Sequence, residues 1–321
     1  SRCYEKSKIS KRETERGAVN LVIAFNKCCD TPLWTNYSLR KKNVIKNIDF
    51  TRSKASTKKT YLVKLENLYN VELSNIIINT PDNSELYGDR ALYIANCVDV
   101  TLYDLTINNT YSLPSKYGYG ISLNNTYNVK VSKMYARATW GVFGNSNVNK
   151  VYLTNCDINR FDIHCYGRDI HFENCNFVDL YNQFGSFYGL VSFKRCTFTN
   201  FKPILIGSQY NAYTDFNIIF EKCVFNLDKK HDFIVGFSGF ANEENPRVEL
   251  RDKCMPNITM KECMINSIGG LKKWYVFNTK SAKDYKGQFH YISNVIIEGL
   301  FTEPQSLQME VFTCKIKTKN K

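Results

Sequence analysis

One phrase, written three times between Val151 and Phe198, decides how this chain folds. The copies read Val151-Tyr-Leu-Thr-Asn-Cys156-Asp-Ile158, Ile170-His-Phe-Glu-Asn-Cys175-Asn-Phe177 and Val191-Ser-Phe-Lys-Arg-Cys196-Thr-Phe198. Apolar residues stand at offsets 0, 2, 5 and 7 of each copy, and most positions between them are polar. Alternation at 0 and 2, and again at 5 and 7, is typical of strands with one buried face. The odd step from 2 to 5 therefore predicts a corner between two short strands.

The phrase recurs along most of the chain, at a spacing that excludes helices between the strands. Ten copies can be followed, with the third apolar position at residues 48, 76, 105, 134, 156, 175, 196, 223, 263 and 300. A strand–helix–strand unit needs roughly 30 residues, more than the tightest of these steps. A further apolar alternation precedes many copies, as in Phe161-Asp-Ile-His-Cys165. Three strands per coil predict an all-β chain, a parallel β-helix of about ten coils.

The repeat divides the chain into three parts. Residues 1–42 lack it, and we expect them to cap the open end of the solenoid, whose strand edges would otherwise pair with other chains. Residues 43–310 form the β-helix, and residues 311–321 form a basic tail. Tight coils in the middle are flanked by coils with long insertions, and loops on a rigid scaffold often carry binding residues.

The net charge of +13 is concentrated at the start of the chain. Residues 1–64 hold 16 Lys and Arg against 5 Asp and Glu, whereas the rest of the chain holds 27 against 25. This distribution argues against a uniformly basic groove, so we expect no nucleic-acid partner. The basic end is then either a solvated or partner-binding end or a polyanion-binding one.

The sequence says less about where the protein works. No run of 18 apolar residues occurs, so no membrane span is predicted. The first residues lack the apolar core of a signal peptide, but the chain starts without Met, so removal of a leader stays open. An extracellular, cell-surface or virion location is favoured, and a homo-oligomer stays open.

The twelve cysteines do not form an obvious disulfide framework. Five share one inward position of successive coils: Cys156, Cys175, Cys196, Cys223 and Cys263. Their side chains are expected to run parallel, which is poor disulfide geometry, so we predict free buried thiols. The other seven could include a bridge. They contain no CxxC pair, and we predict neither a metal nor a cofactor.

The coils, such as Val151-Tyr-Leu-Thr-Asn-Cys156 and Ile170-His-Phe-Glu-Asn-Cys175, resemble those of the pectin-lyase-like superfamily. The resemblance covers about residues 43–301 and looks closest to β-helix repeat proteins of gut Bacteroidales and their phages. It implies a right-handed parallel β-helix. It also implies a polysaccharide as partner, because the superfamily includes polysaccharide lyases, polygalacturonase-type hydrolases, phage tailspikes and non-catalytic adhesins. Fold alone does not choose among these functions.

The catalytic motifs of two branches of the superfamily are missing. The Asn-Thr-Asp, Asp-Asp, Gly-His-Gly and Arg-Ile-Lys motifs of polygalacturonase-like hydrolases do not occur, and neither does the Trp-Ile-Asp-His of pectate lyases. No catalytic residue can therefore be carried over from these enzymes.

The densest polar cluster lies in the tight coils, from Arg160 to Asp169. If Phe161 and Ile163 point inward, Asp162 and His164 point outward from one strand, about 7 Å apart. We take as candidate catalytic residues Asp162, His164 and Arg168. Candidate substrate-binding residues, which add cations, amides and aromatic platforms, are Trp140, Arg160, Tyr166, Gln183 and Tyr188.

This cluster permits more than one chemistry. A lyase needs a base and a cation that stabilises the enolate, which His164 or Tyr188 with Arg160 or Arg168 could supply. A hydrolase needs two carboxylates, for which we pair Asp162 with Asp157 or Asp179. The plainer interpretation is a solvated face with surface ion pairs of little consequence.

Three hypotheses follow from the sequence. The chain is a β-helix that cleaves a polysaccharide as a lyase or hydrolase, a non-catalytic glycan-binding or adhesion module such as a tailspike-like protein, or a purely structural solenoid. Paired acids or a base with a cation would favour the first. An aromatic groove would favour the second, and a featureless surface with an exposed apolar end coil the third.

Overall fold

A computed structural model describes residues 42–51, 61–80, 90–109, 119–137, 141–185, 187–207, 214–238, 256–279 and 294–312. All regular structure in these ranges is β-strand. The described residues thus contain no helix long and apolar enough to cross a membrane. The chain divides into two compact units, residues 1–156 and residues 157–321.

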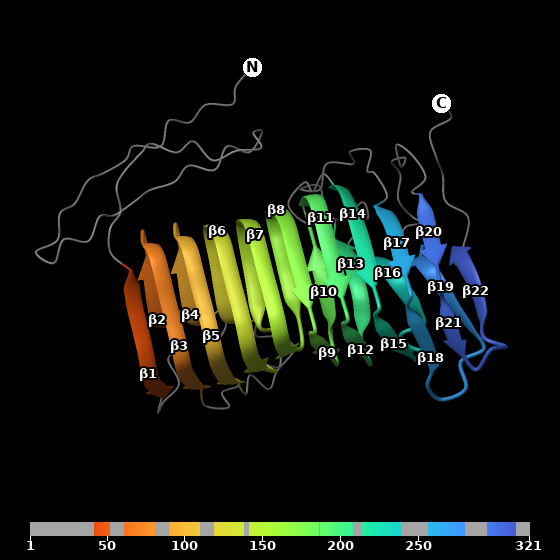
Figure 1. Cartoon of the computed structure of the whole chain (residues 1–321), viewed down its shortest axis with the longest axis horizontal. Helices are drawn as coiled ribbons and strands as arrows, with labels where there is room; N and C mark the ends of the chain where they lie inside the picture. The colour runs from red at the N-terminus through yellow and green to blue at the C-terminus, as the bar shows by residue number, and fades with distance from the viewer. Residues whose placement is uncertain are drawn as a thin grey trace, which may run out of the picture. The chain divides into compact units, whose positions relative to one another are not determined.

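The first unit is built from parallel strands stacked in register (Figure 1). Leu73 pairs with Ile45 of the preceding coil and with Leu102 of the following one, and all three occupy the same offset of the repeat. Because equivalent residues stack, the buried face of each coil continues that of the last. The strands are β1 (Asn43–Thr51), β2 (Tyr61–Glu66), β3 (Tyr69–Thr80), β4 (Arg90–Ala95), β5 (Val98–Asn109), β6 (Tyr119–Ala136) and β7 (Phe143–Ile158), whose last two residues belong to the second unit.

The second unit continues with shorter strands, three to a coil. Each strand from β11 to β19 pairs in parallel with the strand three places later in the chain. The strands are β8 (Phe161–Glu173), β9 (Asn176–Val178), β10 (Tyr181–Phe184), β11 (Phe187–Lys194), β12 (Thr197–Thr199), β13 (Lys202–Gly207), β14 (Thr214–Glu221), β15 (Val224–Leu227), β16 (Phe233–Ser238), β17 (Asn257–Lys261), β18 (Met264–Ser267), β19 (Lys273–Asn278), β20 (Val295–Glu298), β21 (Phe301–Glu303) and β22 (Gln308–Phe312).

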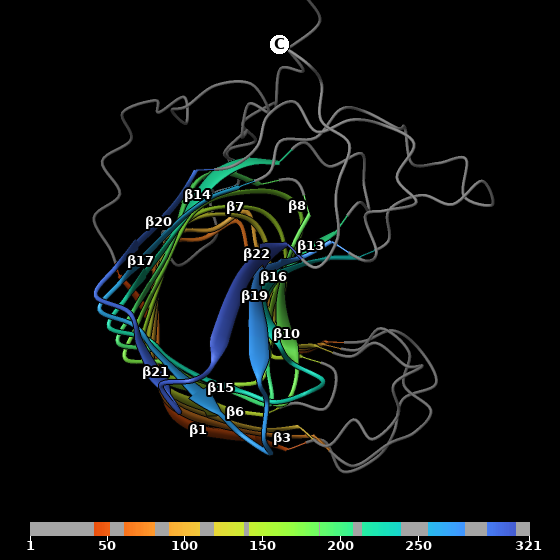
Figure 2. The same ribbon diagram turned by 90° about the vertical axis from the view of Figure 1, so that its right-hand side faces the viewer.

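The winding of this unit is right-handed. In Figure 2 the C-terminal strands face the viewer, and the chain passes from β14 through β15 to β16 counterclockwise as it advances toward the viewer. Parallel crossover connections are right-handed in nearly all proteins. The right-handed parallel β-helix expected from the sequence is therefore confirmed.

The corner predicted inside the repeat lies at its offset 4, where the backbone adopts the left-handed conformation. In the first unit Asn75 and Asn155 have φ of 51° and 55°, and in the second unit Asn174 and Arg195 both have φ of 51°. Asn tolerates this conformation better than most residues. At Asn75 the side-chain Nδ2 also donates to Oδ1 of Asn47 in the coil before, at 2.9 Å. Corner residues thus stack as the core residues do.

The core of the second unit is filled by side chains that stack on their own equivalents. Rings of Phe172 and Phe193 lie 4.7 Å apart and nearly parallel, and Phe193 and Phe220 follow at 5.0 Å. Four of the five ladder cysteines lie in this unit and Cys156 lies in the first, and all five are buried and unbridged, as predicted. Burial raises the pKa of the Cys196 thiol, and in the first unit it raises that of Cys97 to about 11, so these two thiols stay protonated at neutral pH.

The first and last described strands are β1 and β22. Strand β1 begins at Asn43, and β22 ends at Phe312, two residues into the segment expected to be the tail. The predicted cap up to Lys41 and the tail beyond Phe312 lie outside the described residues and stay predictions.

Candidate functional site

The site is built on β8, the strand that follows the corner at residues 159–160 in the second unit. Phe161 and Ile163 are fully buried in the core, so their neighbours point to the other side of the strand. Across the coil boundary, Asp162 pairs in register with Gln183 of β10. The stacking of two coils therefore brings together residues that are 21 positions apart in the sequence.

Arg160 is locked in place by three neighbours. Its Nη2 donates to Oδ2 of Asp162 at 2.5 Å and to Oε1 of Gln183 at 3.2 Å, and its Nη1 donates to the Tyr181 hydroxyl at 2.9 Å. The guanidinium carbon lies 4.3 Å from the centre of the Tyr181 ring, a cation–π contact. Because a guanidinium stays protonated at any ordinary pH, Arg160 and Asp162 form a buried ion pair.

Asp162 in turn holds the imidazole of His164. Nε2 of His164 lies 3.1 Å from Oδ2 of Asp162, the same oxygen that Arg160 contacts. The Asp162 side chain is 1% exposed, whereas that of His164 is 27% exposed. A carboxylate accepts a hydrogen bond from the ring nitrogen that carries the proton. In the neutral ring Nε2 is then the donor, and Nδ1 keeps a lone pair that can accept a proton.

The structure corrects the expected surroundings of this cluster. The sequence places Asp162, Arg160 and Gln183 on a solvated face, but all three are buried. Their burial is tolerated because the two charges cancel, and because Nη2 of Arg160 donates to both Asp162 and Gln183. The expected 7 Å spacing of Asp162 and His164 along the strand is bridged by their side chains. The solvated-face interpretation is therefore wrong for Asp162.

Three other candidates gather in a separate group. Tyr166 has φ of 55° and turns the chain, and Arg168 beyond it pairs in register with Tyr188 of β11. Nε of Arg168 donates to Oδ2 of Asp169 at 3.3 Å. Arg168 is thus held by Asp169, whereas Asp162 is held by Arg160 and contacts His164. The expected role of Arg168 beside His164 stays a prediction. Trp140 lies outside the described residues.

The carboxylates proposed as partners of Asp162 lie on another wall of the coil. Asp157 belongs to the end of β7 and pairs with Asn176 of β9, before the corner that precedes β8. Asp179 lies at the next corner, between β9 and β10, with φ of 73°. The register thus separates both from the strand wall that carries Asp162.

Two residues that support the site were not singled out from the sequence. Tyr181 contacts Arg160 as described, and Asn182 is fully buried, with its Oδ1 accepting a hydrogen bond from the backbone nitrogen of Phe161 at 3.0 Å. Asn182 stands at an inward position of the alternation. A polar residue at a core position was the signal that could have identified it.

Gly185 fixes the backbone behind His164. Its nitrogen donates to the carbonyl oxygen of Ile163 at 2.8 Å, and a Cβ at this position would lie 2.2 Å from the carbonyl oxygen of His164. A backbone atom cannot be displaced as the end of a flexible side chain can. Only glycine therefore fits, and the close approach holds the strand segment that presents the imidazole.

A second histidine of the same unit has a different environment. Nδ1 of His171 lies 2.7 Å from Oγ of Ser192 in the adjacent coil. Burial lowers the pKa of His171, and the nearby charge of Asp169 opposes that shift in part. His171 is therefore half-buried and hydrogen-bonded.

The described residues contain no group of three or more His, Cys, Asp or Glu side chains that could hold a metal ion. What the cluster can supply is an imidazole base, oriented by a carboxylate that an arginine holds. This arrangement suits proton transfer to or from a bound molecule.

No protein-family model and no curated protein matches this sequence. Among solved structures, the tailspike protein gp49 from Pseudomonas phage LKA1 matches 86% of this chain and 47% of its own, with a TM-score of 0.48 and 11% identity. An endo-xylogalacturonan hydrolase from Aspergillus tubingensis matches 82% and 87%, with a TM-score of 0.45 and 10% identity. A family 28 exopolygalacturonase from Yersinia enterocolitica matches 80% and 47%, with a TM-score of 0.36 and 12% identity.

The second unit is a right-handed parallel β-helix, as its in-register parallel coils and its winding show. This is the fold that the resemblance of the sequence to the pectin-lyase-like superfamily implies. The chain spans about half the length of the tailspike and of the exopolygalacturonase, since the matches cover 47% of each. The likenesses concern the fold, and the activity has to be argued from the site.

Breaking the buried ion pair is expected to destabilise the protein strongly. Asp162→Ala leaves the Arg160 charge buried and should lower the free energy of unfolding by about 3–5 kcal/mol. The double variant Arg160→Met/Asp162→Ala should cost less than the sum of the two single changes, because no uncompensated charge remains. Urea unfolding of all variants measures this.

Glu173→Ala is the matched control, because Glu173 forms an exposed pair with Arg195 and its loss should cost about 1 kcal/mol at most. Additive costs in the Arg160 and Asp162 variants would contradict the account of a buried, mutually dependent pair.

His171 is expected to make the fold sensitive to acid. Its folded-state pKa lies below the ordinary value of 6.5, so the unfolded chain binds the proton more tightly. This contribution to stability is present above pH 6.5 and is lost as the pH falls through the folded-state pKa. The loss of unfolding free energy between pH 7.5 and pH 5 should therefore be smaller in His171→Gln than in the wild type. An equal loss in both proteins would contradict the proposed effect of burial.

Proposed function

We propose that this chain recognises a polysaccharide on the wall of its second unit that carries β8 and β10, and that His164 cleaves it as a general base. The observation that carries the proposal is the Arg160–Asp162–His164 chain, in which a buried ion pair orients one partly exposed imidazole. A structural role alone would not need the third member to reach the surface. An origin among gut Bacteroidales or their phages stays a prediction from the sequence.

The chemistry that best suits one oriented base is β-elimination from a uronic-acid polymer. Nδ1 of His164 would take the proton on the carbon next to the sugar carboxylate. The electron pair then forms a carbon–carbon double bond as the glycosidic carbon–oxygen bond breaks, and the leaving oxygen takes a proton from water. Asp162 would stabilise the imidazolium formed in the first step, since its carboxylate already contacts the opposite nitrogen.

A hydrolase with two carboxylates is less well supported. That mechanism needs a second acid about 5–9.5 Å from the first, on either side of the scissile bond. Asp157 precedes the corner that leads to β8, and Asp179 lies at the corner that leads to β10, so neither is on the wall that carries Asp162. Asp162 itself is 1% exposed and engaged with Arg160, which leaves it poorly placed to protonate a leaving group.

A non-catalytic glycan-binding module is the second candidate, and one observation favours it. A lyase needs a cation near the sugar carboxylate. Both expected cations already contact carboxylates of this chain, Arg160 at Asp162 and Arg168 at Asp169. His164 would then bind a sugar hydroxyl and transfer no proton.

A structural solenoid is the third candidate. Its support is the exposure of apolar side chains in the last described strands, with Ile296 47% and Phe301 59% exposed. It gives no reason for a buried ion pair that orients a histidine, so we rank it below the other two.

A depolymerisation screen tests the proposal. Uronic-acid polymers are followed by the absorbance of the unsaturated product, and neutral polymers by new reducing ends. Wild-type protein should release the unsaturated product, and His164→Ala should lose at least about 100-fold in rate, within the range attributed to a general base.

His231→Ala is the matched control. His231 also contacts an aspartate, with 2.9 Å between its Nδ1 and Oδ1 of Asp228, but in a turn between β15 and β16. It should keep the wild-type rate. Cleavage that survives in His164→Ala would contradict the role of His164. Glycan binding without cleavage would replace the lyase by the binding module, and neither binding nor cleavage would favour the structural solenoid.

A further inference from the structure

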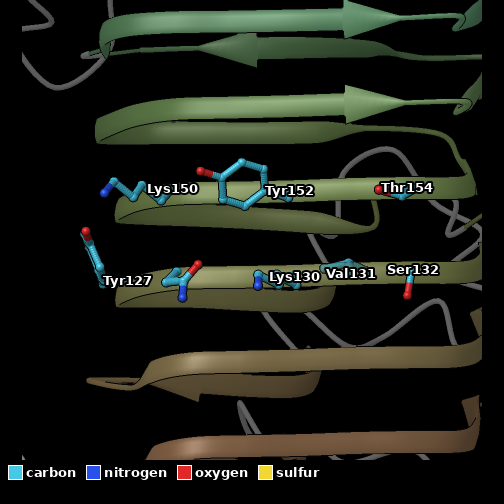
Figure 3. A pocket seen from close by; sticks show the side chains of 8 residues that line it. Tyr127, Lys130, Val131, Ser132, Lys150, Tyr152 and Thr154 are labelled. Atoms are coloured by element: carbon cyan, nitrogen blue, oxygen red, sulfur yellow. The ribbon is translucent and has the colours of Figure 1, made fainter.

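The first unit carries a hollow that the proposed base does not use. It has a volume of about 700 Å³ and lies on the outward side of β6 and β7 (Figure 3). Lys150, Tyr152 and Thr154 follow one another along one strand, and Tyr127, Lys130 and Ser132 along the neighbouring one. We call this hollow and its lining the lysine–tyrosine hollow.

The strands that carry the hollow are anchored by their inward side chains. Val129 and Val131 of β6, and Val151 and Leu153 of β7, are buried in the core with at most 1% exposure. The outward residues alternate with these, so their backbone positions are set by core packing rather than by a mobile loop. A ligand would meet a preformed surface.

The lining of the hollow combines basic, aromatic and hydroxyl-bearing side chains. It contains two lysines, two tyrosines, one serine, one threonine, one asparagine and Val131, and no acidic residue is among the lining side chains. Lys150 lies over the ring of Tyr127, with its Nζ 5.3 Å from the ring centre. In Figure 3 the broad side of the Tyr152 ring is turned toward the viewer. Cations, a ring face and small hydroxyls are thus presented together.

This combination fits a sugar that carries a carboxylate. An aromatic face packs against the apolar side of a sugar ring, hydroxyls and amides bond to its hydroxyl groups, and ammonium groups attract a carboxylate. Neighbouring strands lie about 4.8 Å apart, so an extended polymer laid across them would contact both rows. A nucleic-acid backbone would need cations that continue along its path. Here the row of Lys130 continues through Thr101 to Glu72, an acid.

We propose that the lysine–tyrosine hollow is a binding site for acidic polysaccharide, with Lys130 and Lys150 contacting uronate carboxylates and Tyr152 stacking on a sugar ring. The inference rests on the proposed function only in taking a polysaccharide as ligand. It requires no chemistry at His164, because the hollow belongs to the first unit and Arg160, Asp162 and His164 to the second.

Binding to polygalacturonate tests this, measured by affinity electrophoresis on the full chain carrying His164→Ala, so that cleavage cannot interfere. Lys130→Gln/Lys150→Gln should weaken binding by about 5- to 10-fold, the loss expected for two exposed ion pairs. Tyr152→Ala should weaken it as well, and Tyr152→Phe, which keeps the ring, should bind as the parent does. Fully methyl-esterified polygalacturonate should bind weakly to all variants.

The matched control is Lys46→Gln/Lys64→Gln, which removes the same charge from exposed lysines of β1 and β2 in the same unit. It should change the affinity by less than about twofold. Equal losses in both double variants would overturn the proposal, because binding would then follow net charge. Equally tight binding of duplex DNA, equally weakened by the hollow variants, would also overturn it.

The two proposals can fail separately. If polygalacturonate binds and the hollow variants bind it as tightly as the parent does, the proposed binding site in the hollow is wrong. The proposal for the β8 site is not affected by that result. If polygalacturonate does not bind at all, the proposed binding site in the hollow is also wrong. Cleavage of any polymer would still support the β8 site, provided that the cleavage is lost in His164→Ala.

Discussion

Stacking of equivalent residues in register is the constraint on which both units depend. Each coil pairs its backbone with the next, so a residue in one coil lies against its counterpart in the neighbouring one. Flat rings stack at about 5 Å, as Phe177, Phe198 and Phe225 do. The left-handed corner makes this possible, because it turns the chain within a single residue and leaves the strands on either side in register. A one-residue slip would expose every stacked side chain.

The same stacking produces the candidate site. Arg160 at the corner and Asp162 on β8 are close in the sequence, but the residues that complete their burial, Tyr181 and Gln183, come from the next coil. A charge in such a place is tolerated only when it is paired. The pair then leaves His164 as the member that reaches the surface, held at one nitrogen. Core packing, the buried ion pair and the orientation of His164 thus all follow from the register in which neighbouring coils pair.

The sequence predicted the coils and the corner because both are periodic. Val151, Leu153 and Cys156 recur at fixed offsets in each coil, and such a repeat can be recognised without knowing which residues are in contact in the fold. It also brought Asp162 and His164 together, since they share a strand. It failed on the burial of Asp162, because alternation assigns a side of the strand and does not say what covers it. Asn182 was not predicted for a related reason, because its role depends on one hydrogen bond to the backbone of the adjacent coil.

The most direct test of the oriented base is the tautomer of His164. The chain has four histidines, so a long-range proton–nitrogen NMR spectrum of ¹⁵N-histidine protein contains four ring patterns, and His164→Gln identifies the one that belongs to His164. Because Nε2 faces the carboxylate of Asp162, the account predicts a proton on Nε2 and a bare Nδ1 in the neutral ring. A ring protonated at Nδ1, or an equal mixture of tautomers, would contradict it.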